Sequence, residues 1–281
     1  MNAKDYAVNA DDVFVLPEAV IKIKQLIDDQ KASMDEIADV INYDPAITSQ
    51  VLKIANSALY KFPATISTVS KAIQVIGTKS VYDLVLAYGV SSAFQSISSE
   101  VIDLERFWER GVSCGLLAKY FAEELGVKEP ERLFVCGLLH NIGELVMVKF
   151  NPEAAQLCAK FDVNTTPLDL ELTHLGFSYA ELTGELLKLW GLPLAIYQPI
   201  KRIHPSLATA LTKEDQILQL SYLLSVNNIY KEHYTSHSRL TPYLYENLGL
   251  DLPHVNDALD LTNLQFMSAM AVFSPSSFAM F

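Results

Sequence analysis

Residues 136–147 of the chain read CGLLHNIGELVM. This stretch is an apolar run that His140 and Asn141 interrupt, after which the apolar pattern resumes. Together with the residues from Pro130 onward, the pattern predicts one helix over residues 130–150. A polar pair in the middle of so apolar a helix has three explanations: it binds a metal ion, it is what is left of a metal site, or it fixes a buried turn.

Helical periodicity extends over nearly the whole chain, and several of the expected helices begin at recognisable caps. Ser33 and Glu36 form a capping box before one helix, and Asp44 followed by Pro45 provides the N-cap and first helical position of the next. No stretch of alternating Val, Ile and Thr indicates a strand, so the sequence predicts an all-α fold. The expected helices cover residues 16–29, 33–44, 44–60, 69–77, 79–94, 104–126, 130–150, 152–161, 167–175, 178–190, 193–202 and 213–230.

Composition and charge exclude several classes of function. Half of the 281 residues are hydrophobic and the formal net charge is −12. So acidic a chain repels phosphate backbones, and we expect no direct binding to DNA or RNA. No uncharged apolar run approaches about 18 residues and no signal peptide is evident, so we expect a cytoplasmic protein without a membrane span. Cys114, Cys136 and Cys158 are expected as core thiols in a reducing compartment.

The chain is expected to form two helical lobes with a boundary near the polar stretch SISSE, residues 96–100. We expect an N-terminal arm over residues 1–15, a first lobe over 16–103, a second lobe over 104–230 and a helical extension with a tail over 231–281. The tail SPSSFAMF either frays or docks Phe278 and Phe281 on an apolar groove. The sequence leaves homo-oligomerisation open.

Several motifs, taken in order, resemble the HDOD family, the HD-related output domains of bacterial signalling proteins. They are LPEAV, IADVINYDPAITSQVLKIANSALY, ISTVSKAIQVIGTKSVYDLVL, FW, GLLHNIGELV and WGLP, between about Leu16 and His204. The resemblance implies an all-α fold of two lobes, the first peculiar to HDOD proteins and the second related to HD metal-dependent phosphohydrolases. It also implies a role as a signalling or scaffolding module.

The HD relationship implies a metal site made by a helix-borne His, a His-Asp pair and a distant Asp. This sequence departs from that set. Arg110 stands after FW, where a His is expected, and a cation there repels a metal ion. The His-Asp pair is His140-Asn141, and the amide lacks the charge of a carboxylate. A unit charge pair at about 4 Å is worth about 4 kcal/mol at an effective dielectric of about 20, so the loss weakens metal binding strongly.

Three further positions also depart from the implied set. Tyr179 takes a place where a His often follows the Gly-containing turn, and His204 is one histidine where two commonly adjoin. Ser221 stands where a final Asp is expected, with Asp215 as a possible substitute. The remaining candidate ligands are His140 and His204, with Asn141 as a weak third, and catalytic sites need at least three good protein ligands.

The same residues have structural interpretations. We expect His140 to hydrogen-bond a backbone carbonyl, and Asn141 to hydrogen-bond across to a neighbouring helix. Arg110 is expected to bond Asn141 or Glu144, so that its guanidinium fills the former metal position. The degenerate pocket would then comprise Arg110, His140, Asn141, Tyr179 and His204.

Other polar and aromatic residues were assigned by their local pattern. Asn56 and Ser57 interrupt an apolar helix; they cap a neighbouring element or bridge the lobes, or else they line a ligand or partner groove. The remaining assignments make Trp108 and Trp190 core anchors, His174 a surface residue, and His233 and His237, with Lys231 and Arg239, a solvated loop or an anion site.

Two functions of different classes follow from these residues. The first is a non-catalytic signalling or scaffold module that binds a protein, or a nucleotide second messenger, through an apolar groove between the lobes, with no cofactor. The second is a metal-dependent phosphohydrolase that uses a divalent metal held by His140, Asn141 and His204. A weaker third hypothesis is a nucleotide-binding pseudoenzyme in which Arg110 meets a phosphate.

Overall fold

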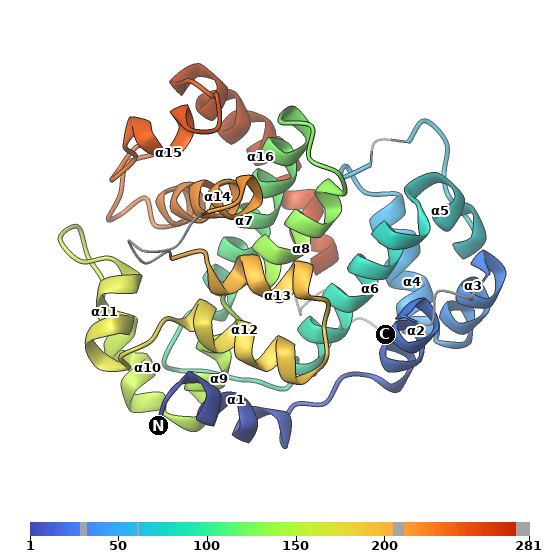
Figure 1. Ribbon diagram of the computed structural model, residues 1–281, viewed down its shortest axis with the longest axis horizontal. Coiled ribbons are helices and arrows are strands. Elements are labelled where there is room, and N and C mark those ends of the chain that lie inside the picture. Colours follow the sequence, from blue (N-terminus) through green and yellow to red (C-terminus); the bar gives the residue numbers. More distant parts are fainter. Residues whose placement is uncertain (29–32, 61, 205–210, 274–281) are drawn as a thin grey trace. The chain divides into compact units, whose positions relative to one another are not determined.

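The computed structural model describes residues 1–28, 33–60, 62–204 and 211–273. Within these ranges the chain forms helices and no strand (Figure 1), which confirms the predicted all-α fold. By their internal contacts the residues form two compact units. The larger unit comprises Met1–Phe14 and Ser96–Leu264, and the smaller unit comprises Val15–Gln95 and Gln265–Phe281. The two alternatives for the tail, fraying or docking of Phe278 and Phe281, concern positions outside the described residues.

The smaller unit consists mainly of five short helices that pack pairwise. Both predicted caps are present: Ser33 and Glu36 exchange side chain–backbone hydrogen bonds, and the Asp44 carboxylate accepts the first N–H groups of the next helix. The last helix is buried on almost every side, which agrees with its nearly uniform apolar sequence. The helices are α2 (Glu18–Asp28), α3 (Met34–Tyr43), α4 (Pro45–Ala55), α5 (Val69–Ile76) and α6 (Thr78–Ala93).

The larger unit is built around α8, which packs against α7, α13 and α14. A second group of contacts joins α12 to α1, α9 and α13. The helices of this unit are α1 (Ala3–Asp11), α7 (Leu104–Glu124), α8 (Pro130–Leu139), α9 (Ile142–Phe150), α10 (Pro152–Cys158), α11 (Pro167–His174), α12 (Tyr179–Leu189), α13 (Leu194–Lys201), α14 (Lys213–Ile229) and α15 (Pro242–Glu246). Helix α16 (Leu252–Phe273) begins in this unit, and its residues from Gln265 onward are assigned to the smaller one.

The N-terminal segment, expected as an arm, contains a helix that the sequence pattern did not indicate. Asn2 and Asp5 form a capping box at the start of α1. Its buried face consists largely of alanines, with Tyr6 as the one large side chain. The Tyr6 hydroxyl accepts a hydrogen bond from the Asn151 side chain at 3.0 Å. Because small residues give a weak hydrophobic signal, the contact that holds α1 is not evident from periodicity.

The single helix predicted over residues 130–150 is wrong, because α8 ends at Leu139 and α9 begins at Ile142. His140 and Asn141 form the turn between them, and Asn141 has φ −110° and ψ 13°, outside the helical range. The His140 ring Nδ1 lies 2.6 Å from the Gly137 carbonyl oxygen. In a continuous helix that carbonyl would accept the Asn141 N–H. The polar pair therefore belongs to a buried turn.

Among the described residues, one segment is long and apolar enough to cross a membrane by length and composition. This segment is Pro130–Phe150, and 89% of its most apolar window is buried inside the protein. Core helices of this kind meet the same criterion, because burial among other helices also demands apolar side chains all round. Arg132 and Glu144 interrupt the segment, so its longest uncharged run is far shorter than a membrane span.

Candidate functional site

The centre of the candidate site is a buried ion pair between α7 and α9. The Arg110 guanidinium donates from Nη2 to Glu144 Oε2, and the two side chains are 3% and 11% exposed. This contact is one of the two that the sequence predicted for Arg110. Burial opposes the charge of Arg110, but the nearby Tyr230, Glu144 and Tyr222 outweigh it and raise its pKa. The site therefore contains a permanent cation of its own.

Asn141 adds a second donor to the same carboxylate oxygen. Its side-chain amide donates to Glu144 Oε2, three residues further along the chain. The expectation that Asn141 bonds across to a neighbouring helix is therefore wrong, because its partner lies in the first turn of α9. Asn141 and Arg110 thus donate to the same oxygen of Glu144, and the Asn141 amide helps to hold the Glu144 carboxylate in the ion pair.

Two histidines contact one tyrosine ring. Tyr222 of α14 makes edge-to-face contacts with His140 and with His204, at centroid separations of 5.5 and 4.6 Å. The His140 bond to the Gly137 carbonyl is the backbone contact that the sequence predicted. Its Nε2 is buried without a hydrogen-bonding partner among the described atoms. Neutral rings are favoured at both positions: burial, then Arg110, lowers the pKa of His140 to about 3, and burial lowers that of His204 to about 4.

Tyr179 and a carboxylate that the sequence analysis missed complete the buried cluster. Tyr179 is the first residue of α12, and its backbone N–H donates to Glu171 Oε2 at 2.7 Å. Glu171 is 2% exposed, and burial, together with the charge of Glu144, raises its pKa to about 7. The Tyr179 hydroxyl is buried.

Ser221 and Asp215 are both engaged in local structure. The Ser221 hydroxyl donates to the Ile217 carbonyl one turn earlier in α14, at 2.8 Å. Asp215 forms the capping box of α14 with Thr212 and lies 3.5 Å from Arg202. Neither group supplies the distant carboxylate that an HD metal centre requires.

The donor set does not fit a metal ion. His140 has one feature of a ligand, since its Nδ1 is fixed by a carbonyl and its Nε2 is free. The carboxylate of Glu144 is already paired with Arg110. Across the part of the chain that the structure describes, no group of three or more His, Cys, Asp or Glu side chains is placed to hold a metal. A divalent ion here would have to compete with a buried guanidinium.

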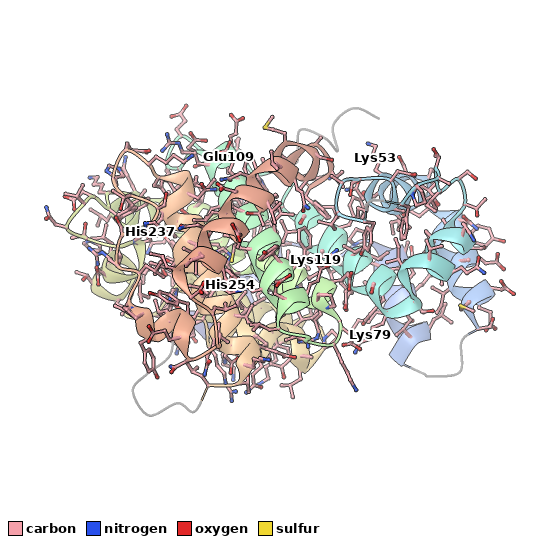
Figure 2. All side chains as sticks on the ribbon, turned by 90° about the horizontal axis from the view of Figure 1, so that it is seen from above. Lys53, Lys79, Glu109, Lys119, His237 and His254 are labelled. Atoms are coloured by element: carbon pink, nitrogen blue, oxygen red, sulfur yellow. The ribbon has the colours of Figure 1, made fainter. Side chains whose placement is uncertain are left out.

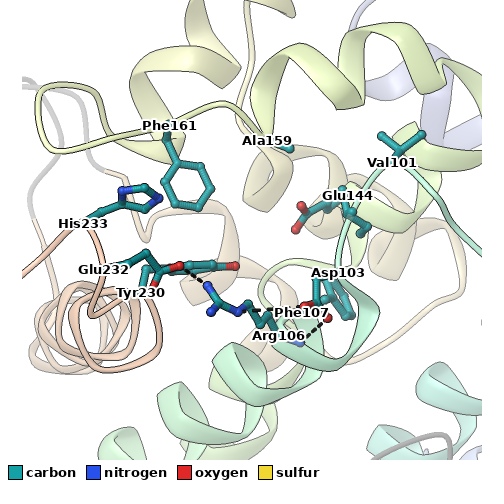
Figure 3. Close-up of a pocket in the computed structure, with 11 residues that line it drawn as sticks. Val101, Asp103, Arg106, Phe107, Glu144, Ala159, Phe161, Tyr230, Glu232 and His233 are labelled. Carbon is teal, nitrogen blue, oxygen red and sulfur yellow. Dashed lines mark hydrogen bonds and ion pairs between the residues drawn. The ribbon is translucent and has the colours of Figure 1, made fainter.

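A pocket of about 370 Å³ adjoins this cluster and shares Glu144 with it. Its walls come from the loop before α7, the start of α7, α9, the segment after α10 and the segment after α14 (Figure 3). The sequence analysis assigned His233 to a solvated loop or an anion site, and the structure places its ring in this lining. The lining residues are Val101, Ile102, Asp103, Arg106, Phe107, Glu144, Ala159, Phe161, Tyr230, Glu232 and His233.

Asn56 and Ser57, proposed as capping or groove residues, lie just after α4 instead of within it. The Asn56 side chain bonds the Leu52 carbonyl and both backbone groups of Ile66, each at 2.8 Å. The Ser57 hydroxyl donates to the Ile54 carbonyl at 2.7 Å. Asn56 therefore ties the end of α4 to the loop before α5. A role of either residue in a partner groove stays a prediction.

The remaining candidates lie mostly where their patterns indicated. Trp108 and the three cysteines are buried, Trp190 is only half-buried, and His174 is exposed. His237 is exposed (Figure 2), and its Nε2 lies 2.8 Å from Asn256 Oδ1. Arg239 donates to the Asn164 carbonyl at 2.9 Å. The loop thus uses its polar side chains for contacts within the protein.

We expect the protein to lose stability as the pH falls below about 6.5. His140 and His204 stay neutral in the folded protein, with pKa values of about 3 and about 4, whereas an unfolded histidine binds a proton near 6.5. Each contributes stability that is lost on acidification, at about 1.4 kcal/mol per pH unit between roughly pH 5 and 6. Glu171 acts in the opposite sense, because its raised pKa favours folding below about 7. Because the two histidines outweigh the one glutamate, the free energy of unfolding should increase with pH over this range.

Urea unfolding at pH 5 and pH 6 measures this slope directly. His140→Gln removes one of the two groups, and the slope should fall by about one proton, or roughly 1.4 kcal/mol per pH unit. His174→Gln is the matched control, because that side chain is exposed. A His140→Gln slope equal to that of the original protein would mean that His140 is not held neutral.

Comparison with known proteins places the chain in a family. The model of the HDOD domain matches residues 13–206. A protein of Treponema pallidum (strain Nichols) is 26% identical over 207 residues, which cover 72% of this chain and 39% of that protein. The chain therefore spans well under half the length of that curated relative.

Two solved structures share the fold at low identity. One is named "Putative phosphohydrolase", from Shewanella amazonensis SB2B, with a TM-score of 0.74 and 23% identity over 96% of this chain and 98% of that one. The other is named "Putative signal transduction protein", from Marinobacter aquaeolei VT8, with a TM-score of 0.71 and 23% identity over 95% of this chain and 60% of that one. These matches show the fold alone. Because the domain model covers more than half of the sequence, the chain belongs to the HDOD family.

Proposed function

We propose that this protein is a non-catalytic signalling or scaffold module of the bacterial cytoplasm, which acts by binding a partner. The observation that carries the proposal is the buried ion pair between Arg110 and Glu144. In an HD-type centre a divalent cation would neutralise the local carboxylates. Here a guanidinium, which cannot activate water, takes that electrostatic role. The protein then needs no metal cofactor and works by docking.

A metal-dependent phosphohydrolase is the second candidate, and one observation favours it. The His140 imidazole has its Nδ1 fixed by a carbonyl and its Nε2 buried without a partner among the described atoms, as in a histidine that ligates a metal. The name of the Shewanella structure points the same way. The nucleotide-binding pseudoenzyme has less support, because Arg110 is paired and is not among the residues that line the pocket.

Metal content and hydrolysis together decide between the two candidates. The purified full chain should contain far less than one equivalent of Fe, Mn, Ni or Zn by elemental analysis. It should also leave bis(p-nitrophenyl) phosphate intact when Mn²⁺ or Ni²⁺ is added. Stoichiometric metal that dissociates on His140→Gln substitution, together with turnover, would overturn the proposal.

Restoring the lost ligands should restore metal binding. In Arg110→His, Asn141→Asp the cation is removed and a carboxylate is added, so we expect Zn²⁺ to bind at least about tenfold more tightly than in the original protein. That gain corresponds to about 1.4 kcal/mol, a fraction of what one added unit charge supplies at this dielectric. Isothermal calorimetry measures it.

Each single substitution serves as a control for the double variant. Arg110→His alone leaves the amide in place, and Asn141→Asp alone leaves the guanidinium beside the new carboxylate. Both should gain less affinity than the double variant. A double variant that is folded by circular dichroism yet binds Zn²⁺ no better than the original would show that Arg110 does not occupy a former metal position.

A further inference from the structure

The pocket beside the ion pair has a charge pattern that disfavours anions. Its described lining contains three carboxylates, those of Asp103, Glu144 and Glu232, and one guanidinium, that of Arg106. Arg106 already donates to Glu232 and lies 3.9 Å from Asp103 (Figure 3). Its charge is thus satisfied within the protein. Arg110 pairs with Glu144 from outside the lining, and with it three carboxylates still stand against two guanidinium groups, so a phosphate or carboxylate entering the pocket would meet a net negative charge.

Glu144 offers the pocket a free acceptor. Both donors on this carboxylate, Arg110 and Asn141, reach the same oxygen, Oε2. Its other oxygen, Oε1, accepts no hydrogen bond from the described residues, and the carboxylate points into the pocket (Figure 3). The residue as a whole is 8% exposed. A carboxylate oxygen without a donor, on a side chain that is otherwise largely buried, is suited to a ligand that brings an N–H group.

One aromatic ring of the pocket, that of Tyr230, already contacts two guanidinium groups. The guanidinium carbons of Arg106 and Arg110 lie 5.7 and 5.9 Å from the centroid of the Tyr230 ring. Phe161 stands edge-to-face against Tyr230 at 4.8 Å and also contacts His233 at 5.8 Å. Ring faces attract cations, and flat guanidinium groups stack on them better than ammonium groups do. The Phe161 ring extends this aromatic surface in the pocket wall.

We propose that this pocket binds a guanidinium group, with its N–H groups on Glu144 Oε1 and Asp103 and its plane against Phe161. The group comes either from an arginine side chain of a partner protein or from a small guanidine. This inference rests on the proposed function, since it names the chemical group that a non-catalytic module would recognise. A pocket of about 370 Å³ has room for one such side chain.

Titration with three probes tests the proposal on the full chain. Agmatine represents a small guanidine, acetyl-Gly-Arg-Gly-amide represents a peptide arginine, and inorganic phosphate represents an anion. We expect both guanidines to bind and phosphate not to bind, as measured by calorimetry or by amide chemical shifts. Tighter binding of the peptide assigns the source to a partner protein, and tighter binding of agmatine assigns it to a small molecule.

Two variants locate the binding in the pocket. Asp103→Asn removes a charge but keeps an N-cap for α7, because Asn also caps helices, and affinity for the guanidines should fall by about tenfold. Phe161→Leu removes the stacking surface and should weaken binding by a factor of several. Glu246→Gln is the matched control, since it removes one negative charge from an exposed residue outside the lining, and affinity should not change.

The outcomes separate this inference from the proposed function. If neither guanidine binds at about 10 mM, or if phosphate binds better, the inference is wrong. It is also wrong if Asp103→Asn and Glu246→Gln have equal effects. The metal and hydrolysis measurements on the same sample test the proposed function independently. A metal-free, inactive protein that does not bind guanidines would contradict this inference and leave the proposed function intact.

Discussion

Arg110→Met is expected to destabilise the protein by about 3 kcal/mol at neutral pH, toward the lower end of the range for breaking a buried ion pair. Met has a similar length and fills the space, so the loss arises mainly from Glu144, which is left buried without its cation. Glu144 is 11% exposed at its side chain and borders the pocket, so some hydration offsets the cost. Urea unfolding at pH 7 measures the change.

Removing the unpaired charge of Glu144 as well should recover much of the lost stability. In Arg110→Met, Glu144→Gln the neutral amide can still accept the hydrogen bond from Asn141, and we expect stability to return by about 2 kcal/mol. The control is Arg106→Met, Glu232→Gln, one turn earlier on α7. That pair involves the same residue types, but its side chains are 40% and 43% exposed, so less than about 1 kcal/mol should be lost.

The comparison of buried and exposed pairs also tests the proposed function. If Arg110→Met costs no more than the exposed pair, Glu144 tolerates the loss of its cation, and the guanidinium has no special electrostatic role. If the double variant is no more stable than Arg110→Met, the loss comes from packing instead of charge. Either result would remove the main support for the proposal that the Arg110 guanidinium takes the electrostatic role of a metal ion.

Much of the fold was predictable because its signals are local. Capping boxes and an N-cap followed by Pro depend on residues within four positions of each other, and those at Ser33 and Asp44 were found in the structure as predicted. The break at His140 was not predictable in the same way. The His140 side chain bonds the Gly137 carbonyl, which in a continuous helix would accept a backbone N–H group. The apolar pattern of the sequence continues across the break and gives no sign of it.

The candidate site was predictable only in part, because its members come from distant segments. Arg110 and Glu144 could be paired from the sequence by considering which residues replace a metal site. Glu171, Tyr222 and Tyr230 were missed, since nothing in their local pattern distinguishes them from other core or helix residues. Tyr222 follows Ser221, a position where the family resemblance implies a ligand, so its neighbourhood offered a weak signal. Tyr222 and Tyr230 reach the site through contacts with His140 and Arg110, which lie 82 and 120 residues earlier in the sequence.

Gly137→Ala is expected to destabilise the protein by about 3 kcal/mol, although Ala is the better helix former. A methyl group added at Gly137 would lie 2.6 Å from the backbone N and Cα of Gly115 on α7 and 2.7 Å from the Cys114 carbonyl carbon. Backbone atoms cannot turn aside as a flexible side chain can, so α7 and α8 must separate. Gly115 and Gly111 of α7 in turn lie close to carbonyl oxygens of α8, which makes the helix crossing a contact of backbones.

The sign of the change distinguishes this explanation from helix propensity. At an unobstructed helical position Gly→Ala should stabilise by about 0.5–1 kcal/mol, whereas the crossing predicts a loss. Gly89→Ala on α6 is the graded control: its added methyl would meet only the Val20 side chain, at 2.8 Å, and Val20 can shift. We expect a smaller loss there, measured for both variants by urea unfolding at one pH. Helices α7 and α8 carry Arg110 and lead into the His140 turn. A Gly137→Ala protein as stable as the original would mean that these helices need not approach so closely. The geometry of the ion pair would then not depend on Gly137.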